Sequence, residues 1–228
     1  MCGRLNVTDD PLSALLMEIV GMPHPGPFDT NIAPTATVAV IRLSELGEPE
    51  VAPMRWWLTP HWAKETSTKY SMFNAKSETL HKSPAFRQPF ASRRCLVPVS
   101  GFYEWARRSG GKVPYYLHPK EHAGLLLAGL WDRWRDPSTD EAVESFTIVT
   151  TAAHEQLSFV HHRQPVMLSL GEAQLWLDSQ SDRESLSRLF EPHLPMTLEA
   201  LPVSSYVSNA RNKGERCLEA AGDPVVLQ

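Results

Sequence analysis

The sequence predicts an α+β protein whose central sheet is antiparallel, in the form of a barrel or a sandwich rather than a βαβ sheet. Three apolar segments, at 113–117, 125–131 and 144–151, follow one another in the middle of the chain. Turn signals at 118–119 and 136–138 separate them. Closely spaced strands joined by turns are typical of antiparallel architectures, and the helical segments lie outside this run.

The N-terminal quarter contains one predicted helix and two predicted strands. The helix spans 8–20, because Thr8 supplies a capping side chain, leucines follow at helical spacing and Gly21 ends it. A proline-rich loop then leads to a β-branched strand at 37–43, and a second strand runs over 51–58.

The remaining elements are assigned from the same signals. In chain order we expect a helix that begins at Ser83, strands at 95–99 and 101–105, a hairpin turn at 109–112, a strand at 166–170, helices at 171–177 and 184–190, and a polar strand and loop from 202 to 214.

Composition indicates a protein with a sizeable core. The chain has 228 residues, of which 42% are hydrophobic and 21% charged, and no linker interrupts it, so we expect a single domain over residues 1–228. No apolar run approaches the ~18 residues of a membrane span, and no secretory signal is visible. Three scattered cysteines resemble neither a disulfide framework nor a metal knuckle, which favours a reducing cytoplasm.

Charge is unevenly distributed along the chain. The net charge is −4, yet the segment 54–135 holds 14 Lys and Arg against 5 Asp and Glu, a local charge of +9. A basic middle within an acidic protein suits a groove for an anionic polymer, although chance clustering of solvated side chains is an equal alternative. Trp56, Trp57 and Trp62 lie in the same region. They are either core and rim residues or a stacking platform for unpaired bases.

Cys2 is the most distinctive candidate for chemistry. Removal of Met1 would leave an α-amine and a thiol on one residue, with reference pKa values of about 8 and about 8.5. Such an aminothiol can act as a thiol nucleophile, or it can trap an aldehyde as an imine that closes to a thiazolidine. The alternative is that Cys2 is simply the second residue of a frayed terminus.

Three further residues complete a candidate constellation. They are the amide of Asn74, the carboxylate of Glu104 among aromatic residues, and His161 beside Arg163. Glu104 is either solvated on the polar face of its strand or partly buried and functional. His161 and His162 are adjacent and would point to opposite faces of a strand. No hydrolase elbow, dinucleotide motif, P-loop or metal-binding spacing occurs, so we expect neither a metal nor a cofactor.

Several motifs occur in a specific order behind the cysteine at position 2. They are Cys2-Gly3-Arg4, Asn31-Ile32-Ala33-Pro34, Arg55-Trp56 with Pro60-His61-Trp62-Ala63, Asn74-Ala75-Lys76-Ser77-Glu78, Arg94-Cys95-Leu96-Val97-Pro98, Gly101-Phe102-Tyr103-Glu104-Trp105, Ala128-Gly129-Leu130-Trp131, Thr150-Thr151-Ala152-Ala153, His161-His162-Arg163-Gln164-Pro165, and Pro202-Val203-Ser204 with Asn209. With these motifs the chain resembles, nearly from end to end, the SRAP family (SOS response-associated peptidase), also called abasic-site processing proteins.

The resemblance implies a single α+β domain with a partly closed, mainly antiparallel β-barrel core flanked by helices. It implies that Cys2 becomes the terminal residue and crosslinks to the aldehyde of an abasic site in single-stranded DNA. By the family pattern Asn74 positions the sugar and the reacting terminus, Glu104 deprotonates the Cys2 amine, and His161 is the acid–base at the sugar ring oxygen. A lyase or autoproteolytic activity is left open.

The resemblance also implies a binding surface for the strand. Its expected residues are Arg4, Lys76 and Arg163 on the phosphates, Pro34 and Trp62 against the bases, and Thr150 beside them. The expected partner is abasic single-stranded DNA, with single-strand/double-strand junctions included. We expect a monomer with no membrane partner, in the cytoplasm and at the nucleoid when DNA is damaged.

Two positions depart from the family pattern. Trp57 stands where glycine is usual, so a bulky ring must fit near the strand end or add a stacking surface. Lys76 stands where arginine is usual, and lysine lacks the bidentate fork on phosphate, so we expect weaker and more salt-sensitive DNA binding.

Three rival functions remain from the residues themselves. Cys2 is the nucleophile of a thiol peptidase, or of a class II glutamine amidotransferase, or is incidental in a non-catalytic single-stranded DNA-binding module. A class II glutamine amidotransferase has an Asn-Gly pair in its oxyanion site, and no Asn-Gly pair occurs in this chain.

Overall fold

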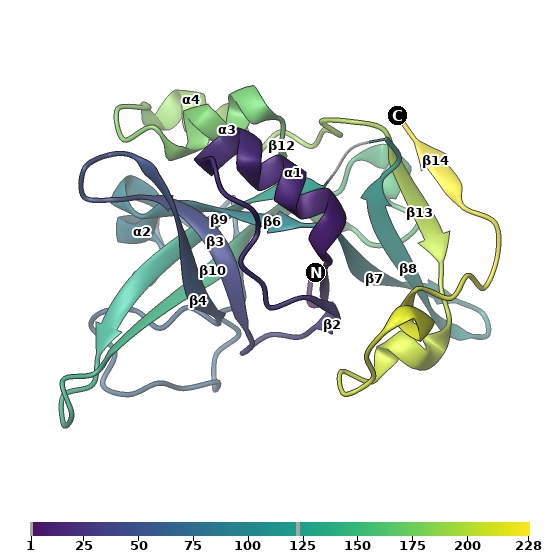
Figure 1. The fold of residues 1–228 in the computed structure, drawn as a ribbon, viewed down its shortest axis with the longest axis horizontal. Helices are drawn as coiled ribbons and strands as arrows, with labels where there is room; N and C mark the ends of the chain where they lie inside the picture. The colour runs from purple at the N-terminus through teal and green to yellow at the C-terminus, as the bar shows by residue number, and fades with distance from the viewer. Residues whose placement is uncertain (1, 122–123) are drawn as a thin grey trace.

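Five strands close into a barrel at the centre of the protein. The structure, a computed structural model, describes residues 2–121 and 124–228 (Figure 1). The barrel strands are β3 (Thr37–Leu43), β4 (Pro49–Trp56), β6 (Arg94–Val99), β9 (Leu125–Arg135) and β10 (Ala142–Ala152). They follow the order β10-β4-β3-β6-β9, and β9 pairs with β10 again, which completes the closure.

The closing seam of the barrel is its least regular part. Every other neighbour pair is antiparallel, whereas β10 runs parallel to β4 with only Ser145 opposite Arg55 and Phe146 opposite Trp56. The predicted partly closed and mainly antiparallel barrel is thereby confirmed. The parallel seam joins strands that lie far apart in the chain, so no turn signal announces it.

Short strands extend this sheet at the end of β10. β5 (Asn74–Lys76) pairs parallel with β10, β11 (Arg163–Pro165) pairs antiparallel with β10, and β12 (Met167–Leu168) pairs with β9. The last residues of β10 therefore hold β5 and β11 close to one another. This edge carries the residues of two predicted site motifs.

A second antiparallel sheet stands beside the barrel. Its order is β14 (Val225–Leu227), β13 (Leu198–Pro202), β8 (Gly111–Pro119), β7 (Gly101–Arg108), β1 (Leu5–Val7) and β2 (Asp29–Ile32). The predicted hairpin between β7 and β8 is confirmed, with Arg108 opposite Gly111. Because β1 pairs with β7, the chain start lies next to the strand that carries Glu104.

The helices are short and flank the strands. They are α1 (Asp9–Val20), α2 (Arg87–Ser92), α3 (Leu170–Leu177) and α4 (Arg183–Arg188), with 3-10 turns at Glu155–Leu157, Ser205–Ser208 and Glu215–Leu218. Gly21 ends α1 as predicted, since it adopts a φ of 70° and donates its N–H to the carbonyl of Met17. No helix among residues 2–121 and 124–228 is long and apolar enough to cross a membrane.

Two predicted elements differ from the structure. The helix expected from Ser83 begins at Arg87, because residues 83–86 form a separate turn closed by the Arg87 N–H on the Ser83 carbonyl. The polar strand expected from 202 onward is wrong. The strand ends at Pro202, and the Ser204 hydroxyl then accepts the N–H of Tyr206 and starts a 3-10 turn.

One hydrophobic cluster links the two sheets. It includes Cys2, which precedes β1, and Phe102 from the second sheet, together with Trp56 and Phe146 from the barrel, all almost fully buried. The rings of Trp56 and Phe146 stack at a centroid distance of 6.4 Å and an angle of 10°. The start of the chain is therefore part of the core rather than a frayed end.

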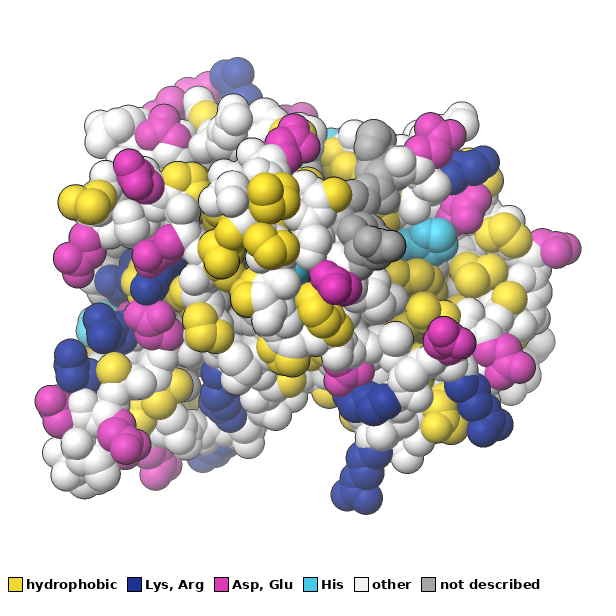
Figure 2. Space-filling model, viewed as in Figure 1, with side chains coloured by type: hydrophobic (Ala, Val, Ile, Leu, Met, Phe, Trp, Pro, Cys, Tyr) yellow, Lys and Arg dark blue, Asp and Glu magenta, His cyan; other side chains and the backbone are white. Residues whose placement is uncertain are grey.

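The face that carries α1 is not a uniformly basic surface. Figure 2 shows hydrophobic side chains gathered over α1, with Lys and Arg interspersed among Asp and Glu around them. Met17 and Met22 are among the large hydrophobic side chains exposed on or next to this helix.

Candidate active site around Cys2

Cys2 and Asn74 are joined by a direct hydrogen bond. Asn74 begins β5, where pairing with Ile148 of β10 fixes its backbone. Its side-chain Nδ2 donates to the backbone carbonyl oxygen of Cys2 at 2.8 Å, and both residues are buried. The amide thus holds the backbone of Cys2 in place. Met1, whose removal the sequence analysis expects, lies outside the described residues.

Glu104 is a buried acid close to Cys2. It lies on β7 opposite Tyr115, and only 5% of its surface is exposed, so the solvated reading of this residue is wrong. Its negative charge acts on both the Cys2 thiol and the His161 ring. Phe102 and Leu117, which pair across the same strands, line the small cavity into which Glu104 and His161 face.

The thiol of Cys2 is protonated at neutral pH in this environment. Burial is the main cause that raises the pKa of Cys2, and the charge of Glu104 raises it further. A hydrogen bond with the backbone of Arg4 opposes this shift only weakly. The buried side chain is therefore a thiol rather than a standing thiolate.

The Nδ1 atom of His161 lies against the backbone of Arg163. It is 3.0 Å from the Arg163 N–H, which donates to an unprotonated Nδ1, and 3.2 Å from the Arg163 carbonyl oxygen, which accepts from a protonated one. Burial lowers the pKa of His161, and the charge of Glu104 partly offsets this. In the tautomer whose Nδ1 accepts the Arg163 N–H, the ring presents an Nε2–H donor at neutral pH.

His161 and His162 stack on each other, with centroids 4.2 Å apart and planes 28° from parallel. The expectation that they point to opposite faces of a strand is wrong, because both residues precede β11. Among the described residues, no three His, Cys, Asp or Glu side chains gather as a metal site requires.

Lys76, Thr150 and Arg163 come together at the edge of the barrel sheet. Lys76 is opposite Thr150 in the pairing of β5 with β10, and Arg163 is opposite Ala152 in the pairing of β11 with β10. Arg163 donates from Nη2 to the Thr150 carbonyl at 2.7 Å. Its guanidinium also forms two hydrogen bonds with the carboxylate of Glu78, at 2.7 and 3.0 Å.

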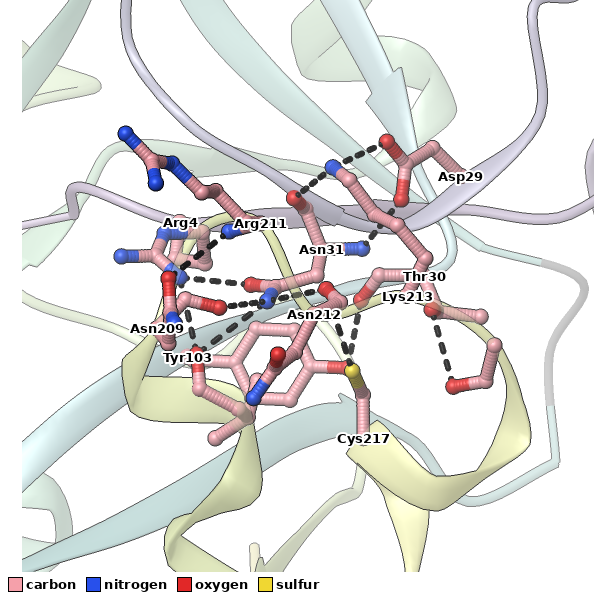
Figure 3. A network of polar contacts seen from close by, with 12 residues as sticks. Arg4, Asp29, Thr30, Asn31, Tyr103, Asn209, Arg211, Asn212, Lys213 and Cys217 are labelled. Carbon is pink, nitrogen blue, oxygen red and sulfur yellow. Dashed lines mark hydrogen bonds and ion pairs between the residues drawn. The ribbon is translucent and has the colours of Figure 1, made fainter.

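Arg4 is engaged inside the protein rather than on the open surface (Figure 3). Its Nη1 donates to Asn31 Oδ1 at 2.7 Å and to the carbonyl of Val207 at 2.8 Å. The amide of Asn31 in turn donates to three carbonyls, those of Val207, Asn209 and Asn212. These contacts explain the Asn31 and Asn209 motifs, since they fasten the C-terminal segment to β2.

The three neighbouring tryptophans have three different environments. Trp56 is fully buried and donates from Nε1 to the Phe73 carbonyl, so the stacking-platform reading is wrong for this residue. Trp57 is half-buried and donates to the carbonyl of Ser67 at 3.1 Å. Trp62 is 56% exposed and is the ring available to a ligand. Pro34 is half-buried and follows β2.

The pairing of Glu78 with Arg163 was not predicted from the sequence. The two residues are 85 positions apart, and neither a period nor a local motif connects them. Only the shared pairing of β5 and β11 with β10 brings them together.

Comparison with known proteins identifies related sequences along most of the chain. The family described as "SOS response associated peptidase (SRAP)" matches residues 1–210. Abasic site processing protein YoqW of Bacillus subtilis (strain 168) is 32% identical over 228 residues, covering 96% of this chain and 100% of YoqW. Abasic site processing protein HMCES of Gallus gallus is 34% identical over 189 residues, covering 72% of this chain and 56% of HMCES.

Solved structures share the fold. A crystal structure of a protein from Bacteroides thetaiotaomicron superposes with a TM-score of 0.82 at 22% identity, covering 96% of this chain and 100% of that one. A protein from Bordetella bronchiseptica has a TM-score of 0.77 at 26% identity, covering 89% of this chain and 100% of its own. The first of these likenesses concerns the fold alone.

Proposed function

Because this chain belongs to the SOS response associated peptidase (SRAP) family, we propose that it processes abasic sites in DNA by forming a covalent crosslink through Cys2. The names of its relatives YoqW and HMCES, both abasic site processing proteins, support the substrate. The observation that carries the proposal is the Asn74 hydrogen bond to the Cys2 carbonyl, which holds the aminothiol residue beside Glu104.

The proposed reaction consumes one aldehyde and releases one water. With Met1 removed, the Cys2 amine attacks the aldehyde carbon of the ring-opened abasic sugar and gives a carbinolamine. Loss of water from the carbinolamine gives an imine. The Cys2 sulfur then adds to the imine carbon while its proton passes to the nitrogen, and a thiazolidine ring results.

The state of the thiol supports this order of steps. A buried, protonated thiol is a poor first nucleophile, whereas an amine beside a carboxylate can be deprotonated and react first. We assign this base to Glu104. His161, which can offer its Nε2–H, is assigned to protonate the sugar ring oxygen as the sugar opens.

The strand is proposed to follow the edge where β5 and β11 meet the end of β10. Lys76 and Arg163 are assigned to its phosphates and Thr150 lies between them. Trp62 and Pro34 are assigned to pack against bases, because Trp62 offers a largely exposed ring. Arg4 is assigned a supporting role, since its Nη1 is committed to Asn31 and Val207. We place the substrate as single-stranded DNA, duplex junctions included, bound by a monomer without a cofactor.

The test is intact-mass spectrometry under denaturing conditions. Tag-free protein is mixed with a single strand that carries one abasic site, and an intact-base strand is the control. The expected adduct has the mass of the protein without Met1 plus the DNA minus one water, and it forms without a reductant. Cleaved DNA in the same spectra would reveal lyase activity.

Cys2→Ala separates the amine from the thiol. This variant keeps a terminal amine after methionine removal, so it should yield an adduct only when borohydride reduces the imine. Absence of any adduct with wild type, together with equal DNA binding by wild type and Cys2→Ala, would refute the crosslinking function. That result would favour a non-catalytic binding module, or a thiol peptidase if a peptide were cleaved.

A further inference from the structure

The guanidinium of Arg163 already holds an anion that belongs to the protein itself. Nη1 donates to Glu78 Oε1 at 2.7 Å and Nη2 donates to Glu78 Oε2 at 3.0 Å. Two parallel N–H···O bonds to two oxygens of one anion are also the arrangement in which arginine binds a phosphodiester. The carboxylate of Glu78 therefore occupies the position that a DNA phosphate would take on Arg163.

Thr150 anchors the edge of the same guanidinium that carries Nε and Nη2. Nη2 donates to the Thr150 carbonyl at 2.7 Å, and Nε lies 3.4 Å from the Thr150 hydroxyl. These contacts do not involve Glu78, so they persist when the carboxylate leaves. Arg163 is thus positioned for an anion with or without Glu78.

Exposure indicates which partner can move. The side chain of Arg163 is 10% exposed, whereas that of Glu78 is 51% exposed and covers the guanidinium from the solvent side. Because the carboxylate is half-exposed, it can leave the guanidinium without a rearrangement of the core, so a polyanion can displace it. The hydrogen bond from Arg163 lowers the pKa of Glu78, which keeps the carboxylate ionised at neutral pH.

A second cation lies near Glu78. Glu78 lines a groove together with Arg183 and His81. Burial, followed by the positive charge of Arg183, lowers the pKa of His81, so Arg183 and His81 are neighbours in this groove. A displaced carboxylate can therefore turn toward Arg183 instead of entering water alone.

We propose that the carboxylate of Glu78 competes with DNA phosphate for Arg163 and so limits the fraction of protein held by undamaged single strands. This inference rests on the proposed function, in which Arg163 is a phosphate ligand. Every strand must displace the carboxylate before it docks. A strand without an abasic site then dissociates readily, whereas an abasic strand is retained by its covalent bond.

The competition changes the fraction of protein that is bound to DNA and leaves the crosslinking step itself unchanged. Displacement weakens reversible binding of damaged and undamaged strands alike, so it does not alter their ratio at low DNA concentration. When undamaged strands are in excess, however, weaker binding leaves a larger fraction of the protein unbound. Excess intact strand therefore inhibits crosslinking by wild type less than it inhibits a protein without the Glu78 carboxylate.

The experiment compares Glu78→Gln with Glu155→Gln, a matched control. Glu155 is exposed, begins the 3-10 turn ahead of His161, and loses the same charge on substitution. Binding of a fluorescent intact-base strand is measured by anisotropy across a salt series. Crosslinking of an abasic strand is then measured with and without excess unlabelled intact strand.

We expect Glu78→Gln to bind the intact strand about threefold to tenfold more tightly than Glu155→Gln at low salt. Its log K should fall more steeply with log salt, by up to about 0.7, because no displaced carboxylate then offsets the charge that Arg163 brings to the phosphate. Excess intact strand should slow crosslinking by Glu78→Gln more than it slows crosslinking by wild type. The gain in affinity should vanish in an Arg163→Ala background.

Each contrary outcome has a distinct meaning. If wild type crosslinks and Glu78→Gln binds intact DNA as Glu155→Gln does, or more weakly, the inference is wrong and Glu78 serves to order Arg163. A gain that survives in the Arg163→Ala background also overturns the inference, since it would then be a general charge effect. If wild type neither binds nor crosslinks abasic DNA, the proposed function fails and the inference with it.

Discussion

The side-chain amide of Asn74 donates a 2.8 Å hydrogen bond to the backbone carbonyl of Cys2, across a separation of 72 residues. The donor lies on a strand fixed by β10, and the acceptor precedes the strand that pairs with β7. This bond ties the barrel sheet to the second sheet at the proposed reaction centre.

Replacing Asn74 should slow crosslinking without preventing folding. Asn74→Ala leaves the buried carbonyl of Cys2 without this donor, a loss of about 1–3 kcal/mol that corresponds to about fivefold to 150-fold in rate if it falls on the transition state. Single-turnover gel assays with an abasic strand measure the rate, and circular dichroism checks the fold. An unchanged rate in a folded Asn74→Ala protein would show that the amide does not position Cys2.

Substitution of Trp57 should reduce the stability of the fold, whereas substitution of Trp62 should reduce DNA binding. The Trp57 ring packs on Phe73 at 5.3 Å and bonds to Ser67, so Trp57→Ala should lower the melting temperature. Trp62→Ala should instead weaken DNA binding by about 1–3 kcal/mol, with little change in melting temperature, because its exposed ring is assigned to a base. Thermal melts give the melting temperature of both variants, and fluorescence anisotropy gives their DNA affinity. A larger loss of affinity for Trp57→Ala than for Trp62→Ala would show that Trp57 is the ring that contacts DNA.

Lys76→Arg should tighten DNA binding and make it less sensitive to salt. Lys76 is exposed and lies opposite Thr150, where a guanidinium would bind a phosphate through two hydrogen bonds instead of a single ammonium contact. Dissociation constants for a single strand across a salt series compare the variant with wild type. Equal affinities at every salt concentration would reject this role for Lys76.

Stability should fall as the pH drops below about 6.5, in part because of His24. Burial lowers the pKa of His24 in the folded protein, so the unfolded chain binds more protons in the window between the folded and unfolded pKa values. The free energy of unfolding therefore decreases as pH falls through that window. Burial also lowers the pKa of His161, so this residue adds to the loss of stability at low pH.

His24→Gln isolates this contribution. The variant removes the titrating ring, so its melting temperature should depend less on pH between about 7 and about 5.5 than that of wild type. The comparison concerns the slope, because the substitution also removes the 3.0 Å contact from the Gly26 N–H to the ring. Equal slopes of melting temperature against pH for the variant and wild type would show that His24 does not contribute to the pH dependence of stability.

The sequence predicted local elements better than it predicted their assembly. The helix that ends at Gly21 and the hairpin between β7 and β8 have their signals within a few residues, and both are confirmed. The parallel seam between β4 and β10 depends on strands about 90 residues apart, where no local rule applies. The same reason explains why the ion pair of Arg163 with Glu78 was missed.

The candidate site shows a similar division. Motif order pointed to Cys2, Asn74 and Glu104, and the structure brings these three together. Arg4 belongs to one of the same motifs, yet its Nη1 is used within the protein. A motif indicates that a side chain matters but does not distinguish a contact with ligand from a contact with the chain. Only the hydrogen-bond partners of each side chain make that distinction.

Because Cys2 is buried in the folded protein, Met1 is most accessible for removal before folding is complete. The shielding neighbours of Cys2 are made later in synthesis, Asn74 on β5 and Glu104 on β7. At about 5–20 residues per second, a ribosome needs roughly 5–20 s to extend the chain from Cys2 to Glu104. A separate aminopeptidase has open access to the Met1–Cys2 bond during that interval, before the folded protein encloses Cys2. Slower translation of the first hundred codons should therefore raise the fraction of protein that emerges with Cys2 as its first residue.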